Sequence, residues 1–116
     1  MRAKAVTVGI PVRDLVAATA WYRSALDLAE PDSEPVDGVV EFDLGPFWLQ
    51  LALAPELAGA RGISVNISVE DAGSERERLA ALGLEVGPLE RFESFVELFA
   101  LTDPDGNEIG FVTELG

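Results

Sequence analysis

Apolar and polar residues alternate along several short segments of the chain, which is the pattern of half-buried β-strands. Two further segments repeat apolar residues at the spacing of one helix face, which predicts amphipathic helices. The strands are predicted at residues 4–12, 39–44, 47–53, 62–69, 84–86 and 94–102, with a last strand after a turn at 103–107. The combination of both patterns predicts an α+β protein.

Each predicted helix begins next to an aspartate. Asp14 precedes the first helix, and Asp71 precedes the second, which is expected at about residues 72–82. An aspartate carboxylate accepts hydrogen bonds from the free N–H groups of a first helical turn, so we expect both residues to be N-caps. Gly83 is expected to end the second helix, because glycine readily adopts the left-handed conformation found there.

The chain also repeats itself. The two capping aspartates lie 57 residues apart, and "VRDL" at 12–15 shares this separation with "VEDA" at 69–72. We interpret the pattern as an internal duplication within a single domain, 1–116, in which residues 1–57 and 58–116 each read β-α-β-β-β. The helices should cover the aliphatic faces of the strands, which leaves the opposite face free to line a cavity.

Composition limits the chemistry. The 116 residues contain no cysteine and no histidine, which excludes disulfides, thiolate nucleophiles, imidazole bases and imidazole metal ligands. The formal net charge of −13 disfavours nucleic acid and anionic membranes as partners; it favours a cationic ligand, although solubility alone also explains it. No signal-peptide pattern is present, and no run approaches the ~20 apolar residues of a membrane span. A cytoplasmic protein is therefore expected.

Alternation places polar and aromatic side chains on the strand faces opposite the aliphatic stripes. Such a mixture of rings, amides, hydroxyls and carboxylates can stack on a planar ligand and attract a cationic one. The candidate ligand-binding residues are Thr7, Glu41, Asp43, Trp48, Gln50, Ser64, Asn66, Phe95, Glu97 and Phe99. Alternatives stay open, because Trp48 can instead pack in the interior or in a dimer contact, and the acidic residues can simply face solvent.

Two segments resemble those of one superfamily. The stretch "VTVGIPVRDLVAATAWYRSALDL" resembles the opening strand and helix of the vicinal oxygen chelate superfamily, and "LTDPDGNEIGF" resembles its closing turn and strand. That superfamily includes glyoxalase I, bleomycin resistance proteins and extradiol dioxygenases. The resemblance implies two tandem βαβββ modules that form a curved mixed sheet around a cavity.

Metal-dependent members of the superfamily use four ligands, usually His, Glu, His and Glu. The resemblance places these ligand positions at Thr7, Gln50, Ser64 and Gly110. Hydroxyl and amide oxygens are weak donors for a divalent transition metal, and glycine has no side chain to offer. We therefore expect no metal site and no cofactor, and metal-dependent glyoxalase or dioxygenase chemistry is disfavoured.

Three functions remain open. The first is metal-independent binding of a small cationic or aromatic molecule, such as an antibiotic, by a homodimer, as the resemblance to bleomycin resistance proteins implies. The second is a lyase or isomerase without a metal, in which Glu97 or Glu41 acts as general base, with Glu97 in an apolar environment between Phe95 and Phe99. The third is a non-catalytic subunit or regulatory domain.

Overall fold

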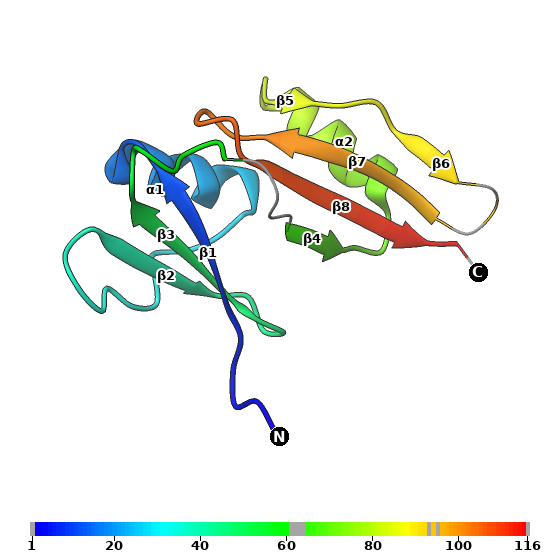
Figure 1. The fold of residues 1–116 in the computed structure, drawn as a ribbon. Coiled ribbons are helices and arrows are strands. Elements are labelled where there is room, and N and C mark those ends of the chain that lie inside the picture. Colours follow the sequence, from blue (N-terminus) through cyan, green and yellow to red (C-terminus); the bar gives the residue numbers. More distant parts are fainter. Residues whose placement is uncertain (1, 61–64, 93, 95, 116) are drawn as a thin grey trace. The chain divides into compact units, whose positions relative to one another are not determined.

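The computed structural model describes residues 2–60, 65–92, 94 and 96–115. The chain divides into two compact units, Met1–Gly59 and Ala60–Gly116, and each has its own sheet and its own helix (Figure 1). Part of the strand predicted at 62–69 lies outside the described residues, as do the candidate site residues Ser64 and Phe95. Neither helix of the described residues is long and apolar enough to cross a membrane.

In the first unit, a helix connects two strands of one sheet (Figure 1). β1 (Thr7–Val12) is followed by α1 (Leu15–Ala25), β2 (Val39–Asp43) and β3 (Trp48–Leu53). The strand order is β1-β3-β2, in which β1 runs parallel and β2 antiparallel to β3. One sheet face forms a core with the apolar side of α1, and its buried residues are Ile10, Val12, Ala18, Tyr22, Ala25, Val40, Phe42, Leu49 and Leu51.

The first unit has one strand fewer than its predicted β-α-β-β-β order. In place of that strand, Ser33 and Glu41 form an isolated bridge, in which the Glu41 backbone N donates to the Ser33 carbonyl O at 2.9 Å. Pro31 and Pro35 flank this bridge. Because proline has no backbone N–H to donate, the polar loop does not continue the ladder as a strand.

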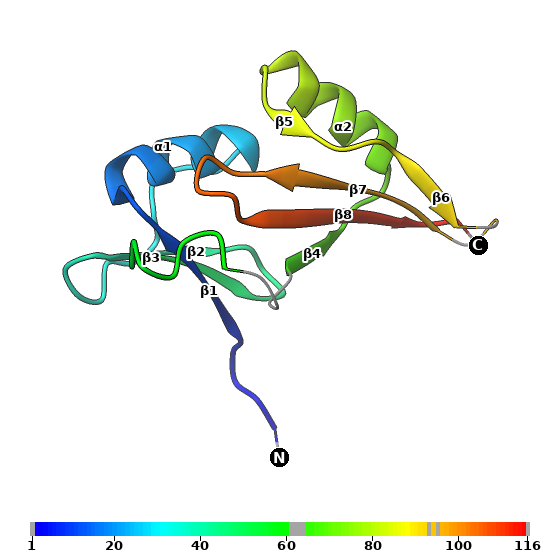
Figure 2. The same cartoon turned by 45° about the horizontal axis from the view of Figure 1, so that its top comes forward.

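The second unit carries the larger sheet. Its elements are β4 (Val65–Ser68), α2 (Ala72–Ala81), β5 (Glu85–Val86), β6 (Glu90–Phe92), β7 (Val96–Thr102) and β8 (Glu108–Glu114). The strand order is β4-β8-β7-β5, with β6 also paired to β7, and α2 lies against one face of the sheet (Figure 2). β6 was not predicted, because its three residues are all exposed and show no apolar alternation.

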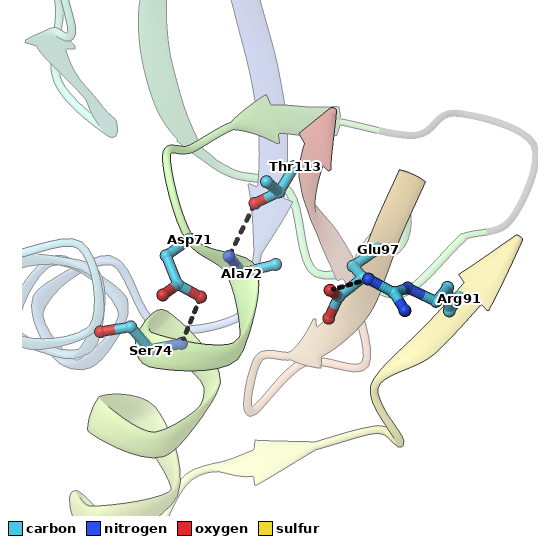
Figure 3. Close-up of polar contacts among 6 residues, drawn as sticks. All are labelled: Asp71, Ala72, Ser74, Arg91, Glu97 and Thr113. Atoms are coloured by element: carbon cyan, nitrogen blue, oxygen red, sulfur yellow. Dashed lines mark hydrogen bonds and ion pairs between the residues drawn. The ribbon is translucent and has the colours of Figure 1, made fainter. Parts of the chain in front are cut away.

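Both predicted N-caps are confirmed. Asp14 Oδ1 accepts a hydrogen bond from the Ala17 backbone N at 3.0 Å, and Asp71 Oδ1 accepts one from the Ser74 backbone N, also at 3.0 Å (Figure 3). Gly83 follows α2 with a φ of 78°, the left-handed conformation that the sequence predicts. The helix boundaries are therefore local features, because each depends on side chains within one turn of the helix end.

Thr113 connects the last strand to the start of α2. Its Oγ1 accepts a hydrogen bond from the Ala72 backbone N at 2.7 Å (Figure 3). The same hydroxyl donates a hydrogen bond to the Val69 carbonyl O at 3.0 Å. The bond to Ala72 satisfies one of the N–H groups that have no partner inside the helix. Thr113 therefore faces α2, which fixes the side of β8 that points toward the core.

The turn at 103–107 is built around a buried carboxylate. Asp103 is only 4% exposed, and its Oδ1 accepts hydrogen bonds from the backbone N of Asp105 at 2.9 Å and of Asn107 at 2.8 Å. Its Oδ2 accepts a third bond, from Asn107 Nδ2, at 2.8 Å. The turn brings β7 and β8 into antiparallel register, beginning with Thr102 opposite Glu108. This register decides which residues of the two strands share a sheet face.

Candidate functional site

Polar side chains gather on the sheet face of the first unit that points away from the buried core. The candidate residues on this face are Thr7, Glu41, Asp43, Trp48 and Gln50. They share this face because successive side chains of a strand point to opposite sides, and their neighbours along the strands, such as Leu49 and Phe42, are buried. In one row across the three strands, Trp48 lies between Thr7 and Asp43. We call these five residues and Gly9 the polar face.

In the next row of the polar face, Gln50 lies between Gly9 and Glu41. The Gln50 Nε2 donates a hydrogen bond to Glu41 Oε2 at 3.1 Å. Its Oε1 lies toward Gly9, at 3.2 Å from the point that a Cβ at this position would occupy. The bond to Glu41 therefore sets the orientation of the amide and leaves its oxygen as a hydrogen-bond acceptor beside the glycine.

The carboxylates of the polar face have no basic partner within the part of the chain that the structure describes. Asp43 Oδ1 accepts a hydrogen bond from the Gly45 backbone N at 2.9 Å, so this side chain also shapes the turn after β2. The ion pairs Arg23–Glu30, Arg78–Glu75 and Arg91–Glu97 all lie outside this face. The face therefore carries negative charge that a cationic ligand could neutralise.

In the second unit, Asn66 lies on the sheet face that points away from α2. It is the register partner of Gly110 on the parallel strand β8, and the adjacent pair, Val65 and Ile109, is buried on the other face. A Cβ on Gly110 would overlap the Asn66 Oδ1 and would lie 3.2 Å from its Cγ. The Asn66 carboxamide therefore occupies the space into which a side chain at Gly110 would project.

The face predicted for Glu97 and Phe99 is wrong. Phe99 is 1% exposed and stacks on Phe111, with ring centroids 5.0 Å apart and planes 5° apart, in the core beneath α2. Glu97 lies on the same side of β7 as Phe99 and is the register partner of Thr113 on β8. It forms an ion pair with Arg91, with 3.4 Å between Arg91 Nη2 and Glu97 Oε1 (Figure 3). Neither side chain shares a face with Asn66, so the described structure does not place Glu97 as a base beside a ligand there.

The error has a physical reason. The segment 94–102 carries apolar residues at both parities, so alternation alone does not identify its buried face. The side opposite α2 is instead formed by Val96, Leu98, Ala100, Val112 and the edge residue Phe92. Sequence reasoning missed these residues, although a signal existed. Once Gly110 is assigned to this face, pairing across the turn at 103–107 assigns Ala100 to it as well.

The residues that the resemblance places at the superfamily's metal-ligand positions do not offer the donors that a divalent transition metal prefers. Thr7 offers a hydroxyl, Gln50 offers a carboxamide whose nitrogen points at Glu41, and the space at Gly110 is filled by Asn66. Such metals prefer imidazole, thiolate or carboxylate donors that converge on one point. Over the described ranges, no three acidic side chains gather in a way that could hold a metal ion.

Comparison with known proteins agrees with the fold. The chain is similar to a glyoxalase/bleomycin resistance protein from Catenulispora acidiphila DSM 44928, with 31% identity, a TM-score of 0.80, and coverage of 96% of this chain and 98% of that chain. It shares 18% identity and a TM-score of 0.81 with TnmS3, an antibiotic-binding protein from Streptomyces sp. CB03234, over 97% of each chain. No curated protein sequence matched the chain.

A third similar structure is FosX, a genomically encoded fosfomycin resistance protein from Listeria monocytogenes, with 18% identity, a TM-score of 0.80, and coverage of 97% of this chain and 94% of that chain. At this identity the likeness to FosX and TnmS3 concerns the fold. The family model for the Glyoxalase/Bleomycin resistance protein/Dioxygenase superfamily matches residues 4–111, which is nearly the whole chain. The chain therefore belongs to the glyoxalase/bleomycin resistance protein/dioxygenase superfamily.

Proposed function

We propose that this protein binds a small cationic or aromatic molecule, such as an antibiotic, without a metal ion and without converting it. The observation that carries the proposal is the arrangement of the polar face: Trp48 beside two carboxylates that pair with no described basic residue, and a carboxamide oriented by Glu41. The indole can stack on a planar ring or attract a cation through its π face. The carboxylates and the Gln50 oxygen supply acceptors for the ligand's N–H groups.

The acidic composition supports the same ligand class. A net charge of −13 attracts cations toward the protein at long range, and the carboxylates of the polar face would hold one at short range. The fold likeness to TnmS3, which is described as an antibiotic-binding protein, supports sequestration as a use of this architecture. In the second unit, Asn66, Ser64 and Phe95 stay candidate ligand-binding residues predicted from the sequence.

An alternative is a metal-independent lyase or isomerase. One specific observation favours it, namely that Gln50 holds the Glu41 carboxylate in a fixed orientation on an accessible sheet face, as a general base requires. Glu97 is less suited to this role, because it lies on the side of its own sheet that faces α2 and forms an ion pair with Arg91. A second alternative, a non-catalytic subunit or regulatory domain, requires that no small molecule bind.

A thermal-shift screen with cationic aromatic compounds, including bleomycin-type drugs, and with Ni²⁺, Zn²⁺, Mn²⁺ and Fe²⁺ tests the proposal. We expect a compound of this class to raise the midpoint of thermal unfolding. At a hundredfold excess over its Kd, the ligand should add about 2.7 kcal/mol to the free energy of unfolding. Trp48→Ala and Glu41→Gln should each weaken that binding about tenfold in calorimetry, through lost stacking and a lost charge-assisted bond.

Glu56→Gln is the matched control, since it removes one exposed carboxylate outside the polar face. It should change the affinity less than twofold, which separates local contacts from overall charge. Stabilisation by a metal would contradict metal independence, and recovery of a chemically changed compound would favour the enzyme. Binding that survives both substitutions on the polar face would place the ligand elsewhere.

We also propose that the protein is a cytoplasmic homodimer. A chain of this size leaves much apolar surface uncovered, and several large apolar side chains are exposed: Val6, Val16, Val36, Leu53, Leu57, Leu82, Leu89 and Phe92. Light scattering at micromolar concentration should give twice the mass of one chain. A mass equal to that of one chain would refute the dimer.

A further inference from the structure

The loop that replaces the missing strand of the first unit bonds to both acidic residues of the polar face. The Asp32 backbone N donates a hydrogen bond to the Glu41 carbonyl O at 2.9 Å. The Asp32 side chain reaches the next position along the strand edge, where its Oδ2 accepts a hydrogen bond from the Asp43 backbone N at 2.8 Å. One residue of the loop therefore holds the backbone of both Glu41 and Asp43.

These two bonds lie on the outer edge of the sheet. In an antiparallel pair, residues that bond to the neighbouring strand alternate with residues whose backbone groups point away from it. The Leu44 backbone N donates to the Phe47 carbonyl O at 3.0 Å, which places Phe42 and Leu44 among the residues that bond inward. The N–H groups of Glu41 and Asp43 therefore point outward, and β2 is the last strand in the order β1-β3-β2.

The Asp32 carboxylate takes the place of a backbone carbonyl in a further strand. A hydrogen bond from an N–H group to a charged oxygen is shorter and stronger than one to a neutral oxygen. The backbone at this point is also fixed, because the Ser33 N donates to the Glu41 O at 3.3 Å and the Glu41 N donates to the Ser33 O at 2.9 Å. Although Asp32 is exposed, its short side chain starts from a held backbone and continues the ladder by one position.

This edge carries the acidic side chains of the polar face. Glu41 and Asp43 lie two residues apart on one strand, so their side chains leave the same face about 7 Å apart. Glu41 lies opposite Gln50, and Asp43 lies opposite Trp48. A strand edge that frays would have to be ordered when a ligand binds, and that ordering lowers the affinity. An edge that is already held avoids this loss.

We propose that Asp32 is a positioning residue for ligand binding on the polar face. It keeps the end of β2 extended, so that the carboxylates of Glu41 and Asp43 stay beside Gln50 and Trp48 before a ligand arrives. Asp32 acts through these two residues and not by touching the ligand, and its functional meaning rests on the binding proposed above. Asp32→Asn keeps an acceptor oxygen at this place, whereas Asp32→Ala removes it.

Amide hydrogen exchange, followed by NMR on the unliganded protein, tests the bond between Asp32 and Asp43. Asp32→Ala should make the Asp43 N–H exchange about tenfold faster, because its acceptor is gone and the end of β2 opens more often. Asp32→Asn should keep the exchange rate within about twofold of that of the unmodified protein. Asp37→Ala is the matched control, since it removes an exposed carboxylate from the same loop, and it should also stay within about twofold. If Asp32→Ala left the exchange at Asp43 unchanged, the proposal would be overturned.

Calorimetry with benzamidinium, a planar aromatic cation that carries N–H donors, supplies the functional readout. Asp32→Ala should weaken its binding about three- to fivefold, whereas Asp32→Asn and Asp37→Ala should each stay within about twofold. Equal weakening by Asp32→Ala and Asp32→Asn would show that the charge of Asp32 acts and not its bond to Asp43, which would also overturn the proposal. If benzamidinium did not bind the unmodified protein, this would count against the proposed function alone, because the exchange at Asp43 decides the role of Asp32 without a ligand.

Discussion

Phe99→Ala is expected to lower the free energy of unfolding by about 3–4 kcal/mol. Phe99 is 1% exposed and stacks on Phe111 at 5.0 Å between ring centroids. Its removal would lose the burial of an aromatic ring and leave a cavity under α2, which the close-packed surroundings can only partly fill. Urea unfolding, followed by the circular dichroism of the sheets and helices, measures the change.

Leu98→Ala is the control, because it changes the adjacent residue of the same strand on the opposite face. Leu98 is only half-buried, so we expect its truncation to lower the free energy of unfolding by about 1 kcal/mol. The comparison also tests the face assignment of β7. A larger loss for Leu98→Ala than for Phe99→Ala would return Phe99 to the cavity-lining face that the alternation pattern predicts.

Asp103→Ala is expected to lower the free energy of unfolding by about 2–4 kcal/mol. The buried carboxylate accepts three hydrogen bonds within the turn, two from backbone N–H groups and one from the Asn107 side chain. Bonds to a charged group contribute about 1.5–3 kcal/mol each, and water can replace part of this loss because Asn107 is half-exposed. The same urea experiment measures the effect.

Two further variants locate the cause of the Asp103 effect. Asp103→Asn keeps one carbonyl oxygen for the backbone N–H groups but places an amide nitrogen against Asn107 Nδ2, so an intermediate loss is expected. Glu108→Gln, an exposed change just after the turn, should stay within about 0.5 kcal/mol. If Asp103→Ala proved as mild as Glu108→Gln, the carboxylate would not organise the turn.

Much of the secondary structure could be predicted because its causes are local. Asp14 and Asp71 cap their helices with their own side chains, and Gly83 adopts the left-handed conformation at the end of α2. The strand missing from the first unit and the unexpected β6 mark the limit of this reasoning. Each depends on whether a short polar segment meets a partner strand, which is not a property of the segment itself.

The candidate site was predictable to the extent that alternation was unambiguous. Across β2 and β3, apolar residues occupy one parity, so the sequence places Glu41, Trp48 and Gln50 on the polar face correctly. Along β7 both parities are apolar, and Phe99 was assigned to the wrong face. The pairing of β7 with β8, together with the contact of Thr113 with α2, decides which face of β7 is buried.

The sequence by itself determined the α+β class, the helix boundaries and the turn at 103–107, and it shows that Thr7, Gln50 and Gly110 carry no imidazole, thiolate or carboxylate. These follow from residue types and from hydrogen bonds that reach only a few positions along the chain. The tertiary structure decided which face of β7 is buried, and it showed that Asn66 fills the space at Gly110. Both depend on strands that are distant in sequence and adjacent in the sheet, where the volume of one side chain limits the other.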